Sequence, residues 1–148
     1  MVNVEHKTFR CELIGPKGKL LDCRTTSVVF PAHDGLVGVL YDHMPMLSQL
    51  GLGIVRVTPV PQEDHTAPEP SAEADFFVDG GFALVAENSV TVVAYDALPL
   101  RDLTAETIEP MIDQTARSLA EADLSPAQHA HENERLRALR RIVESIKP

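Results

Sequence analysis

The first half of the chain alternates apolar and polar residues with the period of a β-strand. In the stretch FRCELI, the apolar Phe9, Cys11 and Leu13 fall on one face. The intervening Arg10 and Glu12 fall on the other face. Further runs of strand length, rich in Val, Ile and Phe, are LDCRTTSVVF, LVGVLY, GIVRVTPV, DFFVDGGFALV and SVTVVAY. Glycine- and proline-containing turns separate these runs, so the pattern predicts a β-sandwich or a flattened barrel.

The second half, from Ala97 onward, repeats its apolar residues with the period of a helix. Thr107 is a candidate N-cap for a first helix that carries Pro110 in its first turn. The stretch Ser125-Pro126-Ala127-Gln128 is a capping box that begins a second helix. The short connection between them favours an antiparallel helical hairpin. The predicted apolar faces contain Ile108, Met111, Ile112, Thr115, Leu119 and Ala122 in the first helix, and Leu136, Leu139, Ile142, Val143 and Ile146 in the second.

This change of pattern predicts two domains, a β-sandwich at residues 1–96 and a helical hairpin at residues 97–148. Within the first domain, residues 58–75 contain four prolines and five acidic residues but no Lys or Arg. Such a segment buries too little apolar surface to offset the entropy lost on ordering. The sequence therefore predicts a flexible acidic loop here.

Composition and charge narrow the possible partners. The 148 residues are 44% hydrophobic and carry a formal net charge of −9. Nucleic acid and anionic lipid bind clustered Lys and Arg, so neither is an expected partner of this chain. The chain begins without a secretion signal, and no apolar stretch approaches the roughly 20 residues of a membrane helix. We therefore expect no direct membrane insertion and any membrane contact to go through another protein.

The stretch DHMPML, residues 42–47, is the main candidate for chemistry. His43, Met44 and Met46, with His33 and a cysteine, could supply a soft ligand set for copper. Methionines more often pack in a core or an interface, which is the simpler interpretation. A copper-binding sandwich stays open as an alternative.

No other motif predicts catalysis or a cofactor. The stretch GPKGKL lacks the glycine spacing and the Ser or Thr of a phosphate loop, and no serine lies in a nucleophile elbow. Cys11 and Cys23 lie at equal distances from Lys17 and would face each other across a hairpin. Without an export signal, we expect both to be free thiols. From the residues alone we therefore predict no catalytic site, no cofactor and, apart from the copper alternative, no metal site.

Six short motifs, taken in order, resemble the ε-subunit family of F-type ATP synthases. The family pattern has a Pro-x-Gly hairpin, a Gly-x-x-Gly loop, His-x-Pro-Leu, a Gly-x-Val-Arg strand, a Gly-Gly-Phe turn and an Asn-x-Val-Thr-Val strand. Here the matching positions are Pro16 and Gly18, Gly35 and Gly38, His43 with residues 45–47, and residues 53–56, 80–82 and 88–92. Family members also end in a two-helix hairpin, so the resemblance covers nearly the whole chain.

The resemblance implies a β-sandwich of about ten strands followed by an antiparallel helical hairpin. It implies a non-catalytic rotor subunit of the central stalk that couples proton-driven ring rotation to ATP synthesis. The implied partners are the γ subunit, the ring of c subunits and, through the hairpin, the catalytic α/β head. The implied location is peripheral, on the cytoplasmic side of the inner or plasma membrane. A freestanding sandwich that acts as a protein-interaction adaptor is the alternative.

The resemblance also implies site residues. For ring docking, it implies two adjoining loops, residues 32–38 and 41–46. Their candidate contacts are Asp34, Gly35, Leu36, Tyr41, Asp42, His43, Met44 and Pro45. For inhibition of ATP hydrolysis, it implies the basic residues Arg135, Arg137, Arg140 and Arg141 of the second helix. Some members bind ATP through an Ile-Asp-x-x-Arg-Ala signature, but here Thr104 and Thr107 replace its Asp and Arg, so nucleotide binding is not predicted.

Overall fold

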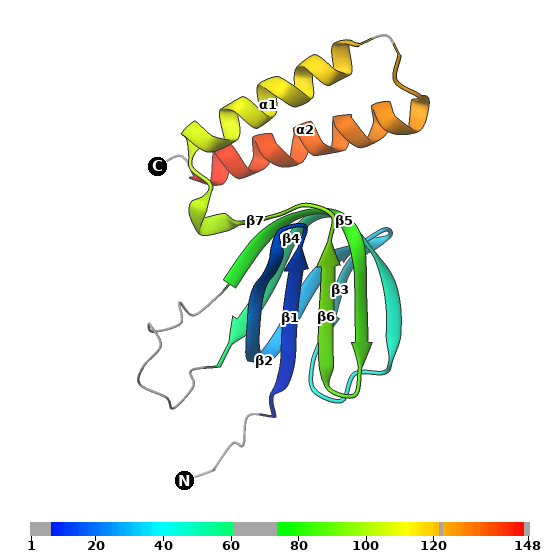
Figure 1. Cartoon of the computed structure of the whole chain (residues 1–148), viewed down its shortest axis with the longest axis vertical. Coiled ribbons are helices and arrows are strands. Elements are labelled where there is room, and N and C mark those ends of the chain that lie inside the picture. The colour runs from blue at the N-terminus through cyan, green and yellow to red at the C-terminus, as the bar shows by residue number, and fades with distance from the viewer. Residues whose placement is uncertain (1–6, 61–73, 122, 147–148) are drawn as a thin grey trace. The chain divides into compact units, whose positions relative to one another are not determined.

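The computed structural model describes residues 7–60, 74–121 and 123–146. The chain divides into two compact units, Met1–Pro99 and Leu100–Pro148. The first unit, the sandwich unit, contains the strands, and the second, the helical unit, contains the helices (Figure 1). Strands followed by two helices is the order that the hydrophobic pattern predicts.

The sandwich unit is a sheet that closes on itself. Its strands are β1 (Phe9–Gly15), β2 (Gly18–Ala32), β3 (Gly35–Val39), β4 (Met46–Pro59), β5 (Ala74–Ala86), β6 (Ser89–Ala94) and β7 (Ala97–Pro99). The strand order is β1-β6-β5-β4-β2-β3, and a further pairing of β1 with β2 completes the closure. Strand β7 pairs with β5. Only the β1–β6 pair is parallel within the described residues, so hairpins account for most of the connections.

The described residues contain seven strands, where the resemblance implies about ten. Two of the longest strands, β2 and β5, change partners along their length. Strand β2 pairs first with β1 and then with β3 and β4, with a register shift between Thr25 and Ser27. Strand β5 arches over the sandwich in Figure 1, and its pairing with β4 is interrupted at Gly51 and Gly80. The count of about ten strands therefore stays an expectation of the resemblance, and the described residues contain seven.

The core of the sandwich unit confirms the predicted alternation. Phe9, Cys11 and Leu13 of β1 are fully buried, and Arg10 is exposed. The other strands contribute Val28, Phe30, Val39, Leu50, Val55, Val57, Phe76, Val78, Ala83, Val85, Val90, Val92 and Ala94. The buried Thr25 hydroxyl donates a hydrogen bond of 2.7 Å to the carbonyl oxygen of Thr58. A polar group at the bend of β2 is thereby satisfied inside an apolar core.

The helical unit begins with a short 3-10 helix, η1 (Leu100–Asp102), followed by α1 (Ala105–Ala120) and α2 (Pro126–Ile146). The predicted N-cap of α1 is wrong by three residues, because Thr104 caps it in a reciprocal box with Thr107. Pro110 consequently lies inside the helix. The predicted start of α2 is confirmed. The backbone N–H of Gln128 donates to Ser125 Oγ, and the backbone N–H of Ser125 donates to Gln128 Oε1.

The two helices lie side by side, and the chain turns back between them (Figure 1). The predicted apolar faces are buried at Ile108, Thr115, Leu136, Leu139, Ile142 and Val143. Met111, Ile112 and Leu119 are half-buried. Ala122 and the side chain of Ile146 lie outside the described residues.

The boundary between the two parts differs from the prediction. Residues 97–99 were predicted as the start of the helical part, but they form β7, with Ala97 opposite Val78 and Pro99 opposite Phe76. A free edge on β5 stabilises this extended segment, which no local pattern reveals. The predicted acidic loop is also shorter at both ends, because β4 continues to Pro59 and β5 begins at Ala74. Residues 61–73 of that loop lie outside the described residues.

Candidate functional site

The two predicted docking loops do not adjoin in the structure. Residues 35–39 form β3, which pairs with residues 28–32 of β2. The turn at His33 and Asp34 therefore lies at one end of this strand, and the β3–β4 loop, residues 40–45, lies at the other. Five extended residues separate them by about 17 Å. The loop assignment of residues 32–38, which the resemblance implied, is wrong here, whereas the hydrophobic pattern predicts a strand at LVGVLY, residues 36–41.

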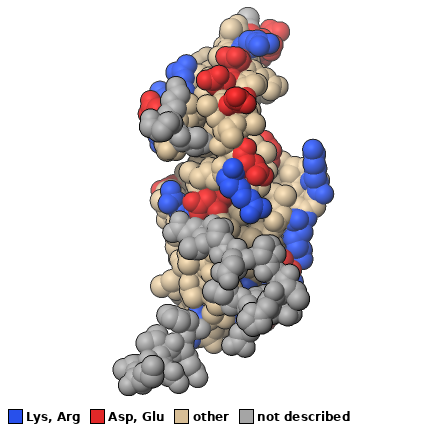
Figure 2. All heavy atoms as spheres, turned by 90° about the vertical axis from the view of Figure 1, so that its left-hand side faces the viewer, with Lys and Arg blue, Asp and Glu red and all other residues tan. Residues whose placement is uncertain are grey.

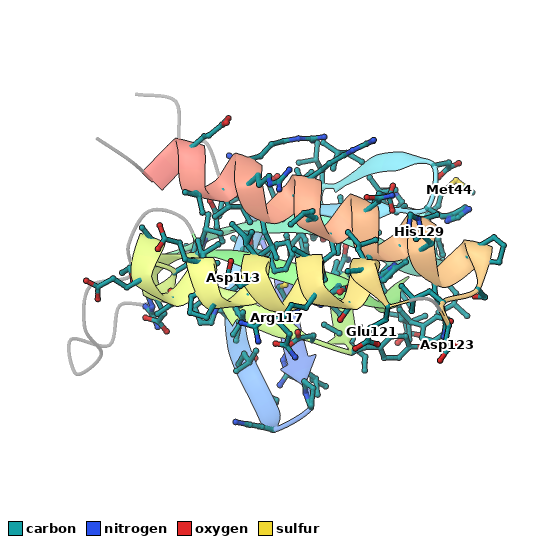
Figure 3. The ribbon with its side chains drawn as sticks, turned by 90° about the horizontal axis from the view of Figure 1, so that it is seen from above. Met44, Asp113, Arg117, Glu121, Asp123 and His129 are labelled. Atoms are coloured by element: carbon teal, nitrogen blue, oxygen red, sulfur yellow. The ribbon has the colours of Figure 1, made fainter. Side chains whose placement is uncertain are left out.

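The residues from Asp34 to Leu47 nevertheless form one continuous strip, which we call the edge segment. Strand β3 is at the end of the strand order, and apolar side chains project from it and from the following loop. Met44 is 77% exposed, Leu36 73% and Leu47 71%. Figure 3 shows Met44 at the rim of the sandwich unit. Apolar side chains this exposed on consecutive segments are typical of an interaction surface.

The β3–β4 loop within the edge segment has a defined shape. Asp42 has a left-handed φ of 62°, and the His43 amide donates to the carbonyl oxygen of Leu40 at 3.2 Å. The ring nitrogen Nδ1 of His43 donates to the carbonyl oxygen of Met44 at 2.8 Å. The ammonium of Lys7 lies 5.5 Å from the centre of the Tyr41 ring, a cation–π geometry.

The geometry of this loop does not support a copper site. Met46 packs against the core, whereas Met44 is exposed. The ring nitrogen Nδ1 of His43 is hydrogen-bonded to the backbone carbonyl oxygen of Met44 and is not free to bind a metal. Among the described residues, no group of three or more His, Cys, Asp or Glu side chains is placed to hold a metal ion.

A second surface, which sequence reasoning did not identify, covers the outer side of β4, β5 and β6. Leu47 lies opposite Leu84, and Phe82 lies opposite Val93. The rings of Phe82 and Tyr95 meet edge to face, with centroids 6.1 Å apart. All five side chains are exposed, Tyr95 to 62%. We call this set, Leu47, Phe82, Leu84, Val93 and Tyr95, the uncharged face.

The uncharged face stands out because the parts of β4, β5 and β6 that form it contain no charged residue, although Gln49 and Thr91 are polar. Residues 44–55, 80–86 and 88–95 contain no Asp, Glu, Lys or Arg. A solvated sheet face normally alternates with polar side chains. The sequence signal was therefore available as a missing class of residue, which a search for motifs does not detect.

Strands β1 and β2 carry the opposite kind of surface. The guanidinium of Arg10 donates to both carboxylate oxygens of Asp22, at 3.1 and 3.0 Å, and the ammonium of Lys19 donates to Asp22 at 3.2 Å. Glu12 joins the cluster through ion pairs with Arg10 and Lys19. These bonds, that from Arg10 foremost, lower the pKa of Asp22 to about 2. On the side of the molecule drawn in Figure 2, basic and acidic side chains are likewise interspersed, as is typical of a solvated surface.

The structure divides the four predicted arginines of α2. Arg137, Arg140 and Arg141 are exposed, and their spacing places them on one side of the helix. Arg135 is half-buried, lies on the opposite side by helical spacing and takes part in another interaction. Glu144 follows within one turn of Arg140 and Arg141, so the positive charge of this face is partly offset. In α1, Asp113, Arg117 and Glu121 alternate in sign at successive turns (Figure 3).

The two threonines that replace the nucleotide-binding signature have a structural role. Thr104 and Thr107 exchange hydrogen bonds at the start of α1, with the Thr104 amide donating to Thr107 Oγ1 at 2.8 Å. The Thr107 amide donates to Thr104 Oγ1 at 3.3 Å. Both side chains are thus used to satisfy the first turn of the helix.

The predicted placement of the two cysteines is confirmed. Cys11 and Cys23 are direct partners across the β1–β2 pair, and both are free thiols. Burial raises the pKa of Cys11 to about 12, while Cys23 is half-buried.

Comparison with known proteins gives a consistent result. Residues 8–100 match the family model described as "ATP synthase, Delta/Epsilon chain, beta-sandwich domain". The chain is 31% identical to the ATP synthase epsilon chain of Pediococcus pentosaceus, covering 96% of this chain and 95% of that one. It is 30% identical to the epsilon chain of Jannaschia sp., with coverages of 83% and 89%. It is 32% identical to the mitochondrial ATP synthase subunit delta of Kluyveromyces lactis, with coverages of 80% and 70%.

Two solved structures share the fold. One is a chain of the Euglena gracilis mitochondrial ATP synthase, "OSCP/F1/c-ring in rotational state 1", with a TM-score of 0.66 and 18% identity over 95% of this chain and 82% of that one. The other is a chain of the Tetrahymena thermophila mitochondrial ATP synthase, "central stalk/cring", with a TM-score of 0.63 and 12% identity over 91% and 96%. Within the described residues, none of the helices has the length and apolarity needed to span a bilayer.

Proposed function

Because the chain belongs to the ATP synthase delta/epsilon chain family, whose members are non-catalytic subunits of the central stalk, we propose that its sandwich unit docks on two rotor neighbours through two surfaces that meet at Leu47. The uncharged face binds the γ subunit, and the edge segment contacts the ring of c subunits. The chain makes and breaks no bonds itself. It transmits rotation of the ring, driven by protons, to the head where ATP is made.

The observation that carries this proposal is the absence of charge from three adjacent strand segments, residues 44–55, 80–86 and 88–95. The centre of a protein interface is depleted of charged residues and enriched in aromatic ones. The uncharged face has both properties, with Phe82 and Tyr95 packed edge to face at its centre. A surface of this kind is costly to leave in water, so a permanent partner is the physical reason to keep it.

The edge segment supports the second contact for a different reason. Its apolar side chains Leu36, Leu40 and Met44 are exposed, and hydrogen bonds to backbone groups hold its loop in one shape. A contact that must persist while the ring transmits torque needs a loop with one defined conformation. Ordering a mobile loop on binding would cost entropy and weaken the contact. The candidate ring contacts stay Asp34, Gly35, Leu36, Tyr41, Asp42, His43, Met44 and Pro45.

The helical unit is proposed to restrain ATP hydrolysis as an antiparallel hairpin that reaches the catalytic α/β head. Arg137, Arg140 and Arg141 supply the exposed positive charge for acidic segments of that head. Arg135, which is half-buried and engaged, is assigned no part in this contact. The proposed location is peripheral, on the cytoplasmic side of the inner or plasma membrane.

The γ contact is tested by placing a charge on the uncharged face. Leu84→Asp is expected to weaken binding to purified γ by at least about tenfold, because the carboxylate would be buried in an apolar interface. The matched control is Leu20→Asp on β2, since Leu20 is 40% exposed and Leu84 is 48% exposed. Binding should also resist added salt, since an apolar contact is not screened. Equal affinity of the two variants for γ would remove the uncharged face from the proposal.

The regulatory contact is tested in the reconstituted ATP synthase. Joint replacement of Arg137, Arg140 and Arg141 by alanine is expected to raise the rate of ATP hydrolysis. Arg117→Ala on α1, also exposed, is the control for loss of a surface charge. A chain that ends at Pro99 should give the largest increase, and this end point keeps β7 paired with β5. Unchanged hydrolysis in both the triple variant and the shortened chain would exclude the helical unit from regulation.

A further inference from the structure

We infer that Asn88, in the turn between β5 and β6, is a positioning residue that holds the β3–β4 loop in the shape required for docking. The inference rests on the proposed role of that loop as a ring contact. It assigns a function to a turn that lies outside the edge segment and shares no sequence motif with it. Figure 1 shows the turn and the loop at the same end of the sandwich unit.

The contact between the two segments is reciprocal. The backbone amide of Asp42 donates to Asn88 Oδ1 at 2.8 Å, and Asn88 Nδ2 donates to Asp42 Oδ1 at 3.2 Å. One asparagine amide thus satisfies a backbone group and a side chain of a loop that lies 46 residues away in sequence. An asparagine can do this because its amide is both a donor and an acceptor.

Asn88 is itself fixed by the sheet. Its carbonyl oxygen accepts a hydrogen bond of 3.2 Å from the amide of Arg10 in β1. The turn that carries it closes the β5–β6 hairpin between Ala86 and Ser89. A rigid hairpin therefore holds Asn88, and Asn88 holds Asp42.

Both segments use a backbone conformation that most residues avoid. Asp42, Glu87 and Asn88 have left-handed φ values of 62°, 51° and 55°. Asn and Asp adopt this region at less cost than other residues with a side chain. Asp42 and Asn88 therefore tolerate the left-handed backbone and also supply the side-chain groups that hydrogen-bond to each other.

The loop needs an outside support because it has little packing of its own. Leu40 and Met44, on either side of Asp42, are both largely exposed. Their positions depend on the backbone path from Leu40 through His43, which the bond to Asn88 anchors at its centre. Losing this anchor would give the loop more conformations to lose on docking, and the affinity for the ring would fall.

The test compares Asn88→Gly with Glu87→Gly in the full chain. Asn88→Gly keeps the left-handed turn and removes only the side-chain amide. Glu87→Gly changes the neighbouring left-handed residue, whose side chain makes none of these bonds. The exchange rate of the Asp42 amide in the free protein, measured by NMR, should rise about 2- to 10-fold in Asn88→Gly alone. Binding to the isolated c-ring should weaken by a similar factor, with the urea midpoint the same in both variants.

A conservative exchange provides the rescue. Asn88→Asp places two carboxylates against each other and should disrupt the contact. Adding Asp42→Asn swaps the side-chain donor and acceptor, keeps an acceptor for the amide of residue 42, and should restore both the slow amide exchange and ring binding.

The outcomes separate the inference from the function on which it rests. If Asn88→Gly leaves the amide exchange or the ring affinity unchanged while the unaltered chain binds the ring, the positioning role of Asn88 is wrong and the ring contact stands. If the unaltered chain does not bind the ring, the proposed ring contact is wrong, and the positioning role falls with it. A double variant that binds no better than Asn88→Asp would also overturn the inference.

Discussion

Replacing Gly81 with alanine should destabilise the sandwich unit more than the same change at Gly18, Gly38 or Gly51. Gly81 has a φ of +134°, a region that residues with a Cβ rarely adopt. An added Cβ would overlap the carbonyl oxygen of Val93 and lie 2.9 Å from the Cα atom of Ala94. Both neighbours are backbone atoms of β6, so neither can rotate away. The variant therefore combines backbone strain with a steric overlap.

The three other glycines separate these two costs. Gly18 has a φ of +130° with nothing within 4 Å of the new Cβ, so Gly18→Ala isolates the strain, about 1–2 kcal/mol. Gly51 has no such φ, but its Cβ would lie 2.9 Å from the Ala32 carbonyl oxygen, so Gly51→Ala isolates overpacking, about 1–3 kcal/mol. Gly38 has neither problem, and Gly38→Ala should change the stability by less than about 1 kcal/mol. Gly81→Ala should cost about 3–5 kcal/mol, more than either single effect.

Tyrosine fluorescence during urea unfolding is a suitable assay. The chain has two tyrosines and no tryptophan. Both Tyr41 and Tyr95 belong to the sandwich unit, so the signal reports on that unit and not on the helices. A cost of 3–5 kcal/mol is a large part of the roughly 5–15 kcal/mol that stabilises a typical domain. If Gly81→Ala unfolds at the same urea concentration as Gly38→Ala, the close approach of β5 and β6 is not as tight as the structure has it.

Further predictions concern the charged cluster, the helix cap, a buried helix residue and the thiols. The native pKa of Asp22, about 2, lies below its ordinary value of 3.8. Its contribution to stability is therefore present above pH 4 and is lost as the pH falls toward 2. In Asp22→Asn, the urea midpoint should depend less on pH over that range. Ser125→Ala should cost about 1 kcal/mol of stability, seen as reduced helical circular dichroism on heating, because it removes the cap of α2. Leu139→Ala should cost about 2–5 kcal/mol in the same experiment, since Leu139 is fully buried. A thiol reagent at pH 8 should leave Cys11, with its pKa near 12, unmodified in the folded chain, and Cys23→Ser should abolish any rapid reaction.

The sequence predicted best those features that depend on local residues. The alternation in β1 identified Phe9, Cys11 and Leu13 as core residues, and the capping box located the start of α2 at Pro126. Both signals arise within a few residues of the feature they predict. The cross-strand pairing of Cys11 and Cys23 was also predictable, because a hairpin fixes its own register.

The features that the sequence did not predict depend on distant partners. Residues 97–99 become β7 only because β5 offers them an edge. The uncharged face requires the register of three strands, which brings Leu47 next to Leu84 and Phe82 next to Val93. Asn88 meets Asp42 for the same reason. Long-range pairing of this kind is set by the whole sheet, so a local window of sequence does not show which residues meet.

The short segment after β7 sets a limit on how far the helices can travel. Pro99 is held against Phe76, and α1 begins at Ala105. The six Cα-to-Cα steps from Pro99 to Ala105 span at most about 22 Å when the chain is fully stretched. The start of α1 therefore stays within this distance of Pro99, however far the other end of the hairpin moves. For the first turn to move farther, β7 would have to separate from β5. Inserting residues into the connection 100–104 would increase the allowed distance without changing either docking surface.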